Sequence, residues 1–170
     1  MKTKKQEVRK ISGTQKCLLC ILAMVISFMP GFFGVFFTPH GESDSWYAML
    51  IKSSLTPSGW VFSVAWTVLY ALLGLALYWV IINARRWREK IVAYVLFLAQ
   101  MVLNAGWSYV FFGAHLPAFA LVILLSLFIV SVWMARVFGT FDRRAAYCVI
   151  PYLLWMMFAF YMNAYIVLMN

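Results

Sequence analysis

Amides and aromatic rings recur at helical spacing in three otherwise apolar segments, and their side chains are the ones best suited to recognise a ligand. The three sets are Gln100, Asn104, Trp107 and Phe111; Phe62, Trp66 and Tyr70; and Tyr152, Trp155, Ala159, Met162 and Asn163. Intervals of three or four residues place each set on one face of a helix. Aromatic walls with a few amides and no charge suit a flat, largely apolar ligand.

Conventional catalytic groups are missing from these segments. All five acidic residues fall in predicted tails or loops, namely Glu7, Glu42, Asp44, Glu89 and Asp142. Proton relays and ion-coupled transporters usually need a carboxylate inside the membrane. Neither a nucleophile beside a histidine base nor a glycine-rich phosphate loop is evident. We therefore predict no catalytic residue of the hydrolytic kind and no cofactor.

The cysteines and histidines are too few and too scattered to predict a metal site. Cys17 and Cys20 are separated by two residues, but the chain has only one further cysteine, Cys148. Its two histidines, His40 and His115, fall in predicted loops on the other side of the expected membrane from Cys17 and Cys20. The cysteines are interpreted as buried small hydrophobic residues.

The composition excludes an ordinary soluble domain. Of the 170 residues, 65% are hydrophobic, 19% aromatic and 11% charged, whereas soluble domains are roughly 45–50% apolar and about 25% charged. A soluble fold of this length could not bury so much apolar surface. The sequence therefore predicts an integral membrane protein.

Long uncharged gaps divide the chain into membrane spans. They comprise 25 residues after Lys16, 32 after Lys52, 45 after Lys90 and 26 after Arg144, and roughly 20 residues suffice for one crossing. The longest gap contains a turn signal at 113–117 that splits it in two. The expected fold is all-α, with five transmembrane helices at about 17–37, 58–83, 91–112, 116–138 and 145–168. They form a single domain, 17–170, behind a basic cytoplasmic tail, 1–16.

Basic residues predict the orientation. Thirteen of the fourteen lysines and arginines fall within 2–16, 85–90 and 136–144, on one side, and only Lys52 falls on the other. The positive-inside rule then places the amino terminus inside and the carboxyl terminus outside. The net charge of +9 is therefore interpreted as a topology signal with anionic lipid headgroups as partners and no nucleic acid.

Depth along the spans groups the candidate residues into one layer. At about 1.5 Å per helical residue, Trp66, Asn104, Trp107, Asn163 and Ala159 lie roughly 8–14 Å from the outer ends of their spans, and Trp155 roughly 20 Å. Two interpretations of this layer stay open. The amides of Gln100, Asn104 and Asn163 either serve a ligand or only join helices.

The tryptophans fall into two groups by depth. The aromatic belt at the membrane interface accounts for Trp46, Trp60 and Trp87 near the span ends, whereas Trp66 and Trp155 lie too deep for it. The loop at 38–57 is longer than a connection requires and is predicted to cover the outer end of the layer.

Several long motifs resemble the translocator protein family, also called tryptophan-rich sensory proteins or peripheral-type benzodiazepine receptors. They are GFFGVFFT at 31–38, WYAMLIKSSLTPSGWVF at 46–62, AWTVLY at 65–70, QMVLNAGWSYVFFG at 100–113 and PYLLWMMFAFYMN at 151–163. The resemblance implies a five-helix bundle, usually a homodimer, that binds porphyrins such as protoporphyrin and, in animal members, cholesterol. Carried over to this sequence, the family's pocket falls on Tyr47, Trp66, Asn104, Trp107, Trp155 and Ala159.

Departures from the family pattern affect the loop and the sterol motif. Lys52-Ser53 and Pro57-Ser58 stand where members often have Lys-Pro and Pro-Pro, and no basic residue follows Tyr165. Sterol binding is therefore not favoured, and the bacterial cell membrane is the expected location.

The residue pattern and the resemblance together leave three functions open. The first is binding of a tetrapyrrole for transport, sequestration or stress- and oxygen-linked sensing, with Tyr47, Phe62, Trp66, Tyr70, Asn104, Trp107, Trp155 and Ala159 as ligand-binding residues. The alternative is an enzyme that degrades porphyrin in light, with Trp66 and Trp155 as the catalytic residues. The third is a sterol- or lipid-binding or purely structural membrane protein.

Overall fold

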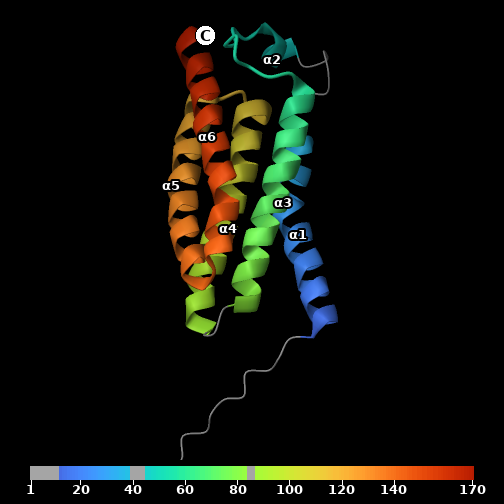
Figure 1. Cartoon of the computed structure of the whole chain (residues 1–170). Helices are drawn as coiled ribbons and strands as arrows, with labels where there is room; N and C mark the ends of the chain where they lie inside the picture. Colours follow the sequence, from blue (N-terminus) through green and yellow to red (C-terminus); the bar gives the residue numbers. More distant parts are fainter. Residues whose placement is uncertain (1–11, 39–44, 84–86) are drawn as a thin grey trace, which may run out of the picture.

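The protein is a bundle of five long helices with one short helix at one end (Figure 1). The computed structural model describes residues 12–38, 45–83 and 87–170. Its helices are α1 (Gly13–Val35), α2 (Ser45–Met49), α3 (Gly59–Asn83), α4 (Trp87–Ser108), the π-helical turn η2 (Tyr109–Gly113), α5 (Pro117–Phe141) and α6 (Arg143–Met169). No strand occurs in these ranges. Five of the helices, with η2 counted as the end of α4, are long and apolar enough to cross a membrane, which confirms the predicted fold class.

Three helices, α1, α4 and α6, begin earlier than predicted. The starts of α1 and α6 are set by polar caps rather than by the gaps between charges. Ser12 Oγ accepts a hydrogen bond from the Gln15 backbone N–H at 3.2 Å, and Gln15 Oε1 accepts one from the Ser12 N–H at 3.0 Å. This capping box starts α1 at Gly13. Asp142 caps α6 in a similar way by accepting from the Arg144 N–H at 2.9 Å.

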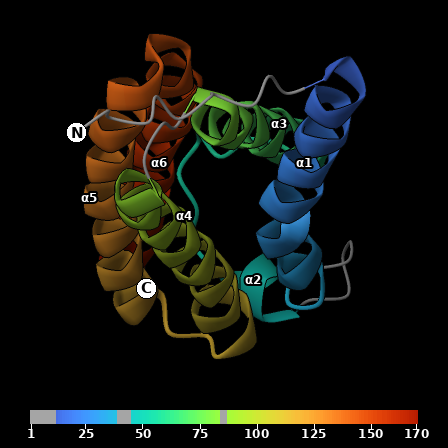
Figure 2. The ribbon, with the colours of Figure 1, turned by 90° about the horizontal axis from the view of Figure 1, so that it is seen from below.

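The five long helices form a closed ring in the order α1, α3, α6, α5, α4 and back to α1. Figure 2, which looks along the bundle from below, shows this ring with α1 and α3 on one side and α5 and α6 on the other. The consecutive helices α3 and α4 are therefore not neighbours in the ring, because α1 lies between them on one side and α6 and α5 on the other.

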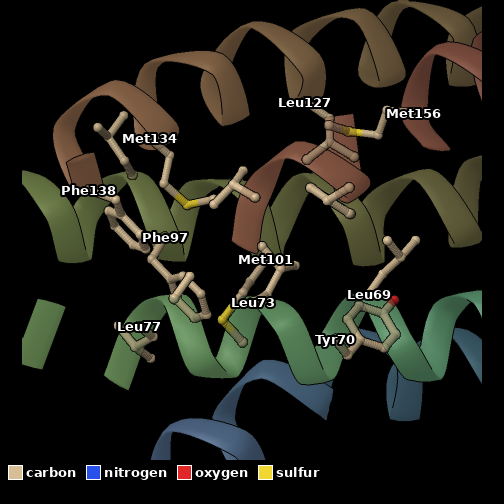
Figure 3. Close-up of a cluster of buried hydrophobic side chains, with 14 of the residues drawn as sticks. Leu69, Tyr70, Leu73, Leu77, Phe97, Met101, Leu127, Met134, Phe138 and Met156 are labelled. Carbon is tan, nitrogen blue, oxygen red and sulfur yellow. The ribbon is translucent and has the colours of Figure 1, made fainter. Parts of the chain in front are cut away.

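The core lies where α3, α4, α5 and α6 meet (Figure 3). Leu73, Leu127, Met134, Phe138 and Met156 are at most 1% exposed there. The rings of Phe97 and Phe138 are nearly parallel, with centroids 6.3 Å apart.

α1 packs on α3 through small residues. A Cβ at Gly74 would lie 2.7 Å from Met24 Sδ and 3.0 Å from Met24 Cα, so only glycine permits this approach. Beside it, Ser27 Oγ donates a hydrogen bond of 2.8 Å to the Tyr70 carbonyl oxygen.

A polar clasp joins α3 to the α5–α6 turn at the end of the bundle away from α2. Asn83 Nδ2 donates to Asp142 Oδ2 at 3.0 Å, and the Arg144 guanidinium lies 3.5 Å over the Trp79 ring. Arg144 also pairs with Asp142 at 2.9 Å. The hydrogen bond from this guanidinium holds the pKa of the Asp142 carboxyl below its ordinary value.

One smaller expectation is corrected and another is confirmed. Cys17 is exposed on the outer face of α1, so its prediction as a buried residue is wrong; Cys20 is half-buried. The turn predicted at 113–117 lies between η2 and α5, and its left-handed residue is His115, with a φ of 57°. His40 and residues 1–11 of the predicted basic tail lie outside the described residues.

Candidate functional site

An inner layer of aromatic rings fills the space between α3 and α6. Trp66 stacks on Tyr70 with centroids 5.3 Å apart, and its ring meets Tyr152 at 6.2 Å and Trp155 at 6.5 Å. Phe62 lies edge-on to Trp155 at 5.8 Å. Four of the predicted ligand-binding residues, Phe62, Trp66, Tyr70 and Trp155, are therefore in one cluster.

A hydrogen-bonded chain crosses this layer and joins three helices. Tyr70 Oη donates to Asn104 Oδ1 at 2.8 Å, and Asn104 Nδ2 donates to Tyr152 Oη at 2.9 Å. Tyr152 Oη in turn donates to Gln100 Oε1 at 3.2 Å. All four residues are buried. The amides of Gln100 and Asn104 therefore do join helices, as one of the two interpretations proposed.

An outer layer lies one to two turns nearer to α2. Trp107 Nε1 donates to Asn163 Oδ1 at 3.1 Å, and Asn163 Nδ2 donates to the Pro117 carbonyl oxygen at 2.8 Å. The Trp107 ring stacks on Phe111 at 5.1 Å and meets Phe112 edge-on at 5.8 Å. Trp107 packs against both the main core and this outer cluster, so it links the two layers.

The helix α2 covers the outer layer. Tyr47 packs edge-on against Phe112 at 5.4 Å and against Phe111 at 6.3 Å. Trp46 meets Phe111 at 5.8 Å and stacks on His115 at 4.2 Å with an interplanar angle of 8°. Trp46 therefore packs on the protein, although its sequence position indicated the interfacial belt. Burial against these rings raises the pKa of the Tyr47 hydroxyl.

A short strap after α2, residues 50–53, is fastened to the far end of α6. The Asn170 carboxamide pairs with both backbone groups of Ile51, accepting from its N–H at 2.9 Å and donating to its carbonyl at 3.2 Å. Ser53 Oγ and Tyr161 Oη are 2.8 Å apart. α2 and the strap therefore span from η2 across to α6, over the outer layer.

Trp155 also faces outward. It lines an apolar groove of about 470 Å³ between α3 and α6, together with Ala65, Val68, Leu69, Pro151, Leu154 and Phe158. Its Nε1 is buried without an acceptor among the described residues, which leaves one unused hydrogen-bond donor beside the inner layer. Ala159, one turn further along α6, is 8% exposed and packs in the main core.

The site carries no charge inside the bundle. Apart from Lys52 in the strap, its polar groups are amides, hydroxyls and indole N–H groups. Within the described ranges no group of three His, Cys, Asp or Glu side chains could hold a metal ion. Such a site can hold an aromatic molecule by stacking and by single hydrogen bonds, and it offers no acid, base or nucleophile in the membrane interior.

Some contributors were not predicted from the sequence. Phe112 enters the cluster because η2 is a π-helical turn, so that both Phe111 and Phe112 reach Trp107 and Tyr47. Asn170 and Tyr161 contribute by hydrogen bonding to the strap, and no local sequence pattern predicts these contacts. Tyr152 was placed on the stripe of α6 by its spacing, three residues before Trp155, but it was not among the predicted ligand-binding residues.

Comparison with known proteins shows the family of this chain. The model of the TspO/MBR family matches residues 20–169. The chain belongs to the TspO/MBR family. It is 36% identical over 157 residues to the tryptophan-rich protein TspO of Chlorobaculum tepidum, covering 92% of this chain and 98% of the relative. It is 34% identical to the human translocator protein over 73% of this chain and 74% of the relative.

A third relative is the tryptophan-rich sensory protein of Cereibacter sphaeroides, which is 32% identical over 67% of this chain and 70% of its own length. These matches and the five apolar helices show a multi-span membrane protein of this family, and they confirm the resemblance found in the sequence.

Proposed function

We propose that this TspO/MBR family member binds a tetrapyrrole, such as protoporphyrin, between the inner and outer aromatic layers. Its role would be transport, sequestration or stress- and oxygen-linked sensing of that ligand. The observation that carries the proposal is the continuous set of rings from three long helices, with amides and hydroxyls but no charge among them. Relatives named translocator protein and tryptophan-rich sensory protein fit such a role.

The shape and chemistry of the cluster favour a flat ring system. Stacked and edge-on rings provide flat apolar surfaces on both sides of an inserted plane, and Trp155 Nε1 offers a donor that has no acceptor among the described residues. The rings touch one another in this structure. A ligand therefore inserts by parting side chains of α3 and α6 near Trp66 and Trp155, with α2 as the cover.

Titration of the purified protein with protoporphyrin tests this function. Saturable quenching of tryptophan fluorescence is expected, and Trp66→Phe and Trp155→Phe are each expected to weaken the dissociation constant several-fold. Trp133→Phe is the matched control, because Trp133 is 57% exposed on α5, outside the ring. Equal affinities in wild type, Trp66→Phe and Trp155→Phe would refute the site. A protein that binds no tetrapyrrole at micromolar concentration would favour a purely structural role.

One observation favours a second function, the light-dependent degradation of bound porphyrin. Trp155, Trp66 and Tyr70 form an unbroken series of oxidisable rings, with centroids 6.5 Å and 5.3 Å apart. In this alternative the indoles of Trp66 and Trp155 exchange electrons with the light-excited ligand. Illumination of the aerobic complex would then bleach the porphyrin band faster than that of free porphyrin in detergent, and Trp66→Phe would remove the difference.

A further inference from the structure

The aromatic site leaves the acidic groups of an amphiphilic ligand without a partner in the membrane interior. Its amides and hydroxyls are already bonded to one another. An ionised carboxylate buried there would lose its hydration without compensation. Tetrapyrroles with free acid side chains must therefore keep those groups at an end of the bundle.

The two ends differ in charge. Lys16, Lys90, Arg136, Arg143 and Arg144 lie at the end away from α2. At the α2 end, the charged side chain within the described residues is Lys52, in the strap. The outer aromatic layer lies next to that end, so among the described residues Lys52 is the cation available to a ligand held there.

Lys52 is held in a fixed position by backbone carbonyl oxygens. Its Nζ donates to the carbonyl oxygens of Tyr47 at 2.7 Å, Leu50 at 3.1 Å and Ala48 at 3.3 Å. These acceptors are neutral dipoles, in contrast to Arg144, whose guanidinium is paired with the Asp142 carboxylate. The bond to Ala48 is the longest and can be exchanged for an ionic one, which is shorter and stronger.

The ammonium is also in contact with the aromatic site. It lies 4.7 Å from the Tyr47 ring centroid, and that ring also packs against Phe111 and Phe112. Because the strap is fastened to Asn170 and Tyr161, much of the entropy of ordering Lys52 is spent before a ligand binds.

We propose that Lys52 binds a carboxylate of the ligand and thereby selects amphiphilic acids, such as tetrapyrroles with free propionates, over their neutral esters. This inference rests on the proposed tetrapyrrole site. It adds an orientation, with the ring system among the aromatic layers and the acid groups toward α2.

The test compares protoporphyrin with its dimethyl ester, using the full chain in neutral detergent. Lys52→Gln keeps a polar side chain of similar length but removes the charge, and is expected to weaken protoporphyrin binding about tenfold while leaving the affinity for the ester unchanged. Lys52→Arg is expected to retain most of the affinity for the acid. Lys16→Gln, at the end of the bundle away from α2, changes the net charge by the same amount and is expected to alter the affinity for neither porphyrin.

Each alternative outcome is decisive. Equal weakening of acid and ester by Lys52→Gln would show that Lys52 only caps α2, and no weakening of either would show that it takes no part; both overturn the inference but leave the tetrapyrrole site standing. Wild-type protein that binds neither porphyrin would instead remove the proposed function itself. A melting temperature measured for each variant separates loss of binding from loss of folding.

Discussion

At the scale of single residues, Asn104 is the point where three helices of the ring are joined. Its amide accepts from Tyr70 on α3 and donates to Tyr152 on α6, while the residue itself belongs to α4. A buried amide needs both kinds of partner, and here each is a tyrosine whose ring lies against Trp66. The same two tyrosines therefore join the helices through Asn104 and form part of the aromatic site.

Replacing Asn104 by leucine is expected to lower stability by about 1–3 kcal/mol, because it leaves the buried Tyr70 hydroxyl without an acceptor. The measurement is reversible unfolding in detergent, followed by near-ultraviolet circular dichroism. Ser126→Ala is the control, since Ser126 Oγ bonds only to a carbonyl of its own helix on an exposed face. Unchanged stability of Asn104→Leu would show that the chain through Asn104 does not hold the helices.

At the scale of elements, two short segments shape the outer layer. α2 has only five residues, too few for a stable isolated helix, and it is held by its contacts with Phe111 and Phe112 and by Lys52 at its last carbonyls. η2 widens the end of the third span, so two consecutive phenylalanines serve one cluster. Both segments depend on partners far away in sequence.

The packing of α1 on α3 gives a prediction at this scale. Gly74→Ala places a methyl group 2.7 Å from Met24 Sδ and 3.0 Å from Met24 Cα, so α1 must move away from α3 and the melting temperature is expected to fall. Gly106→Ala is the matched control, because its Cβ would meet nothing within 4 Å and alanine favours the helix by up to about 1 kcal/mol. Equal stability of the two variants would contradict the close approach.

At the scale of the whole molecule, the closed ring separates two chemically different ends. The clasp of Asn83, Asp142 and Arg144 lies at one end, and α2 and the strap lie at the other (Figure 1). The ring also turns many large apolar side chains outward, among them Leu98, Val102, Ile129 and Trp133, as a lipid-exposed surface requires. The homodimer remains a prediction.

Orientation in the membrane can be checked directly. Because thirteen of the fourteen basic residues fall on one side of the predicted topology, we expect the amino terminus and the connection between α3 and α4 to be cytoplasmic and α2 to face the opposite compartment. Single cysteines at Lys16 and Leu55, introduced into a variant whose native cysteines are replaced by serine, should differ in labelling by an impermeant maleimide added to intact cells. Only the cysteine at Leu55 should react, and the reverse pattern would overturn the assigned topology.

The sequence by itself determined the number of helices, their approximate bounds and the residues on their polar and aromatic faces. These properties belong to contiguous segments: an apolar run must pair its own backbone groups in a membrane, and spacing along a helix places residues on one side. Trp66, Asn104, Trp107 and Trp155 could be selected from spacing and depth for this reason. Helix starts were less accurate, because Ser12 and Asp142 set them through local caps.

Only the tertiary structure decided the order of helices in the ring, the partners of each amide and the position of Lys52. Such facts depend on which surfaces meet across long separations in sequence: 48 residues between Asn104 and Tyr152, and 119 between Ile51 and Asn170. No local pattern encodes these meetings, because each is selected by the packing and hydrogen bonding of the whole bundle. The sequence thus showed Lys52 only as a basic residue in an outer loop, whereas the tertiary structure shows its ammonium fixed beside the aromatic site.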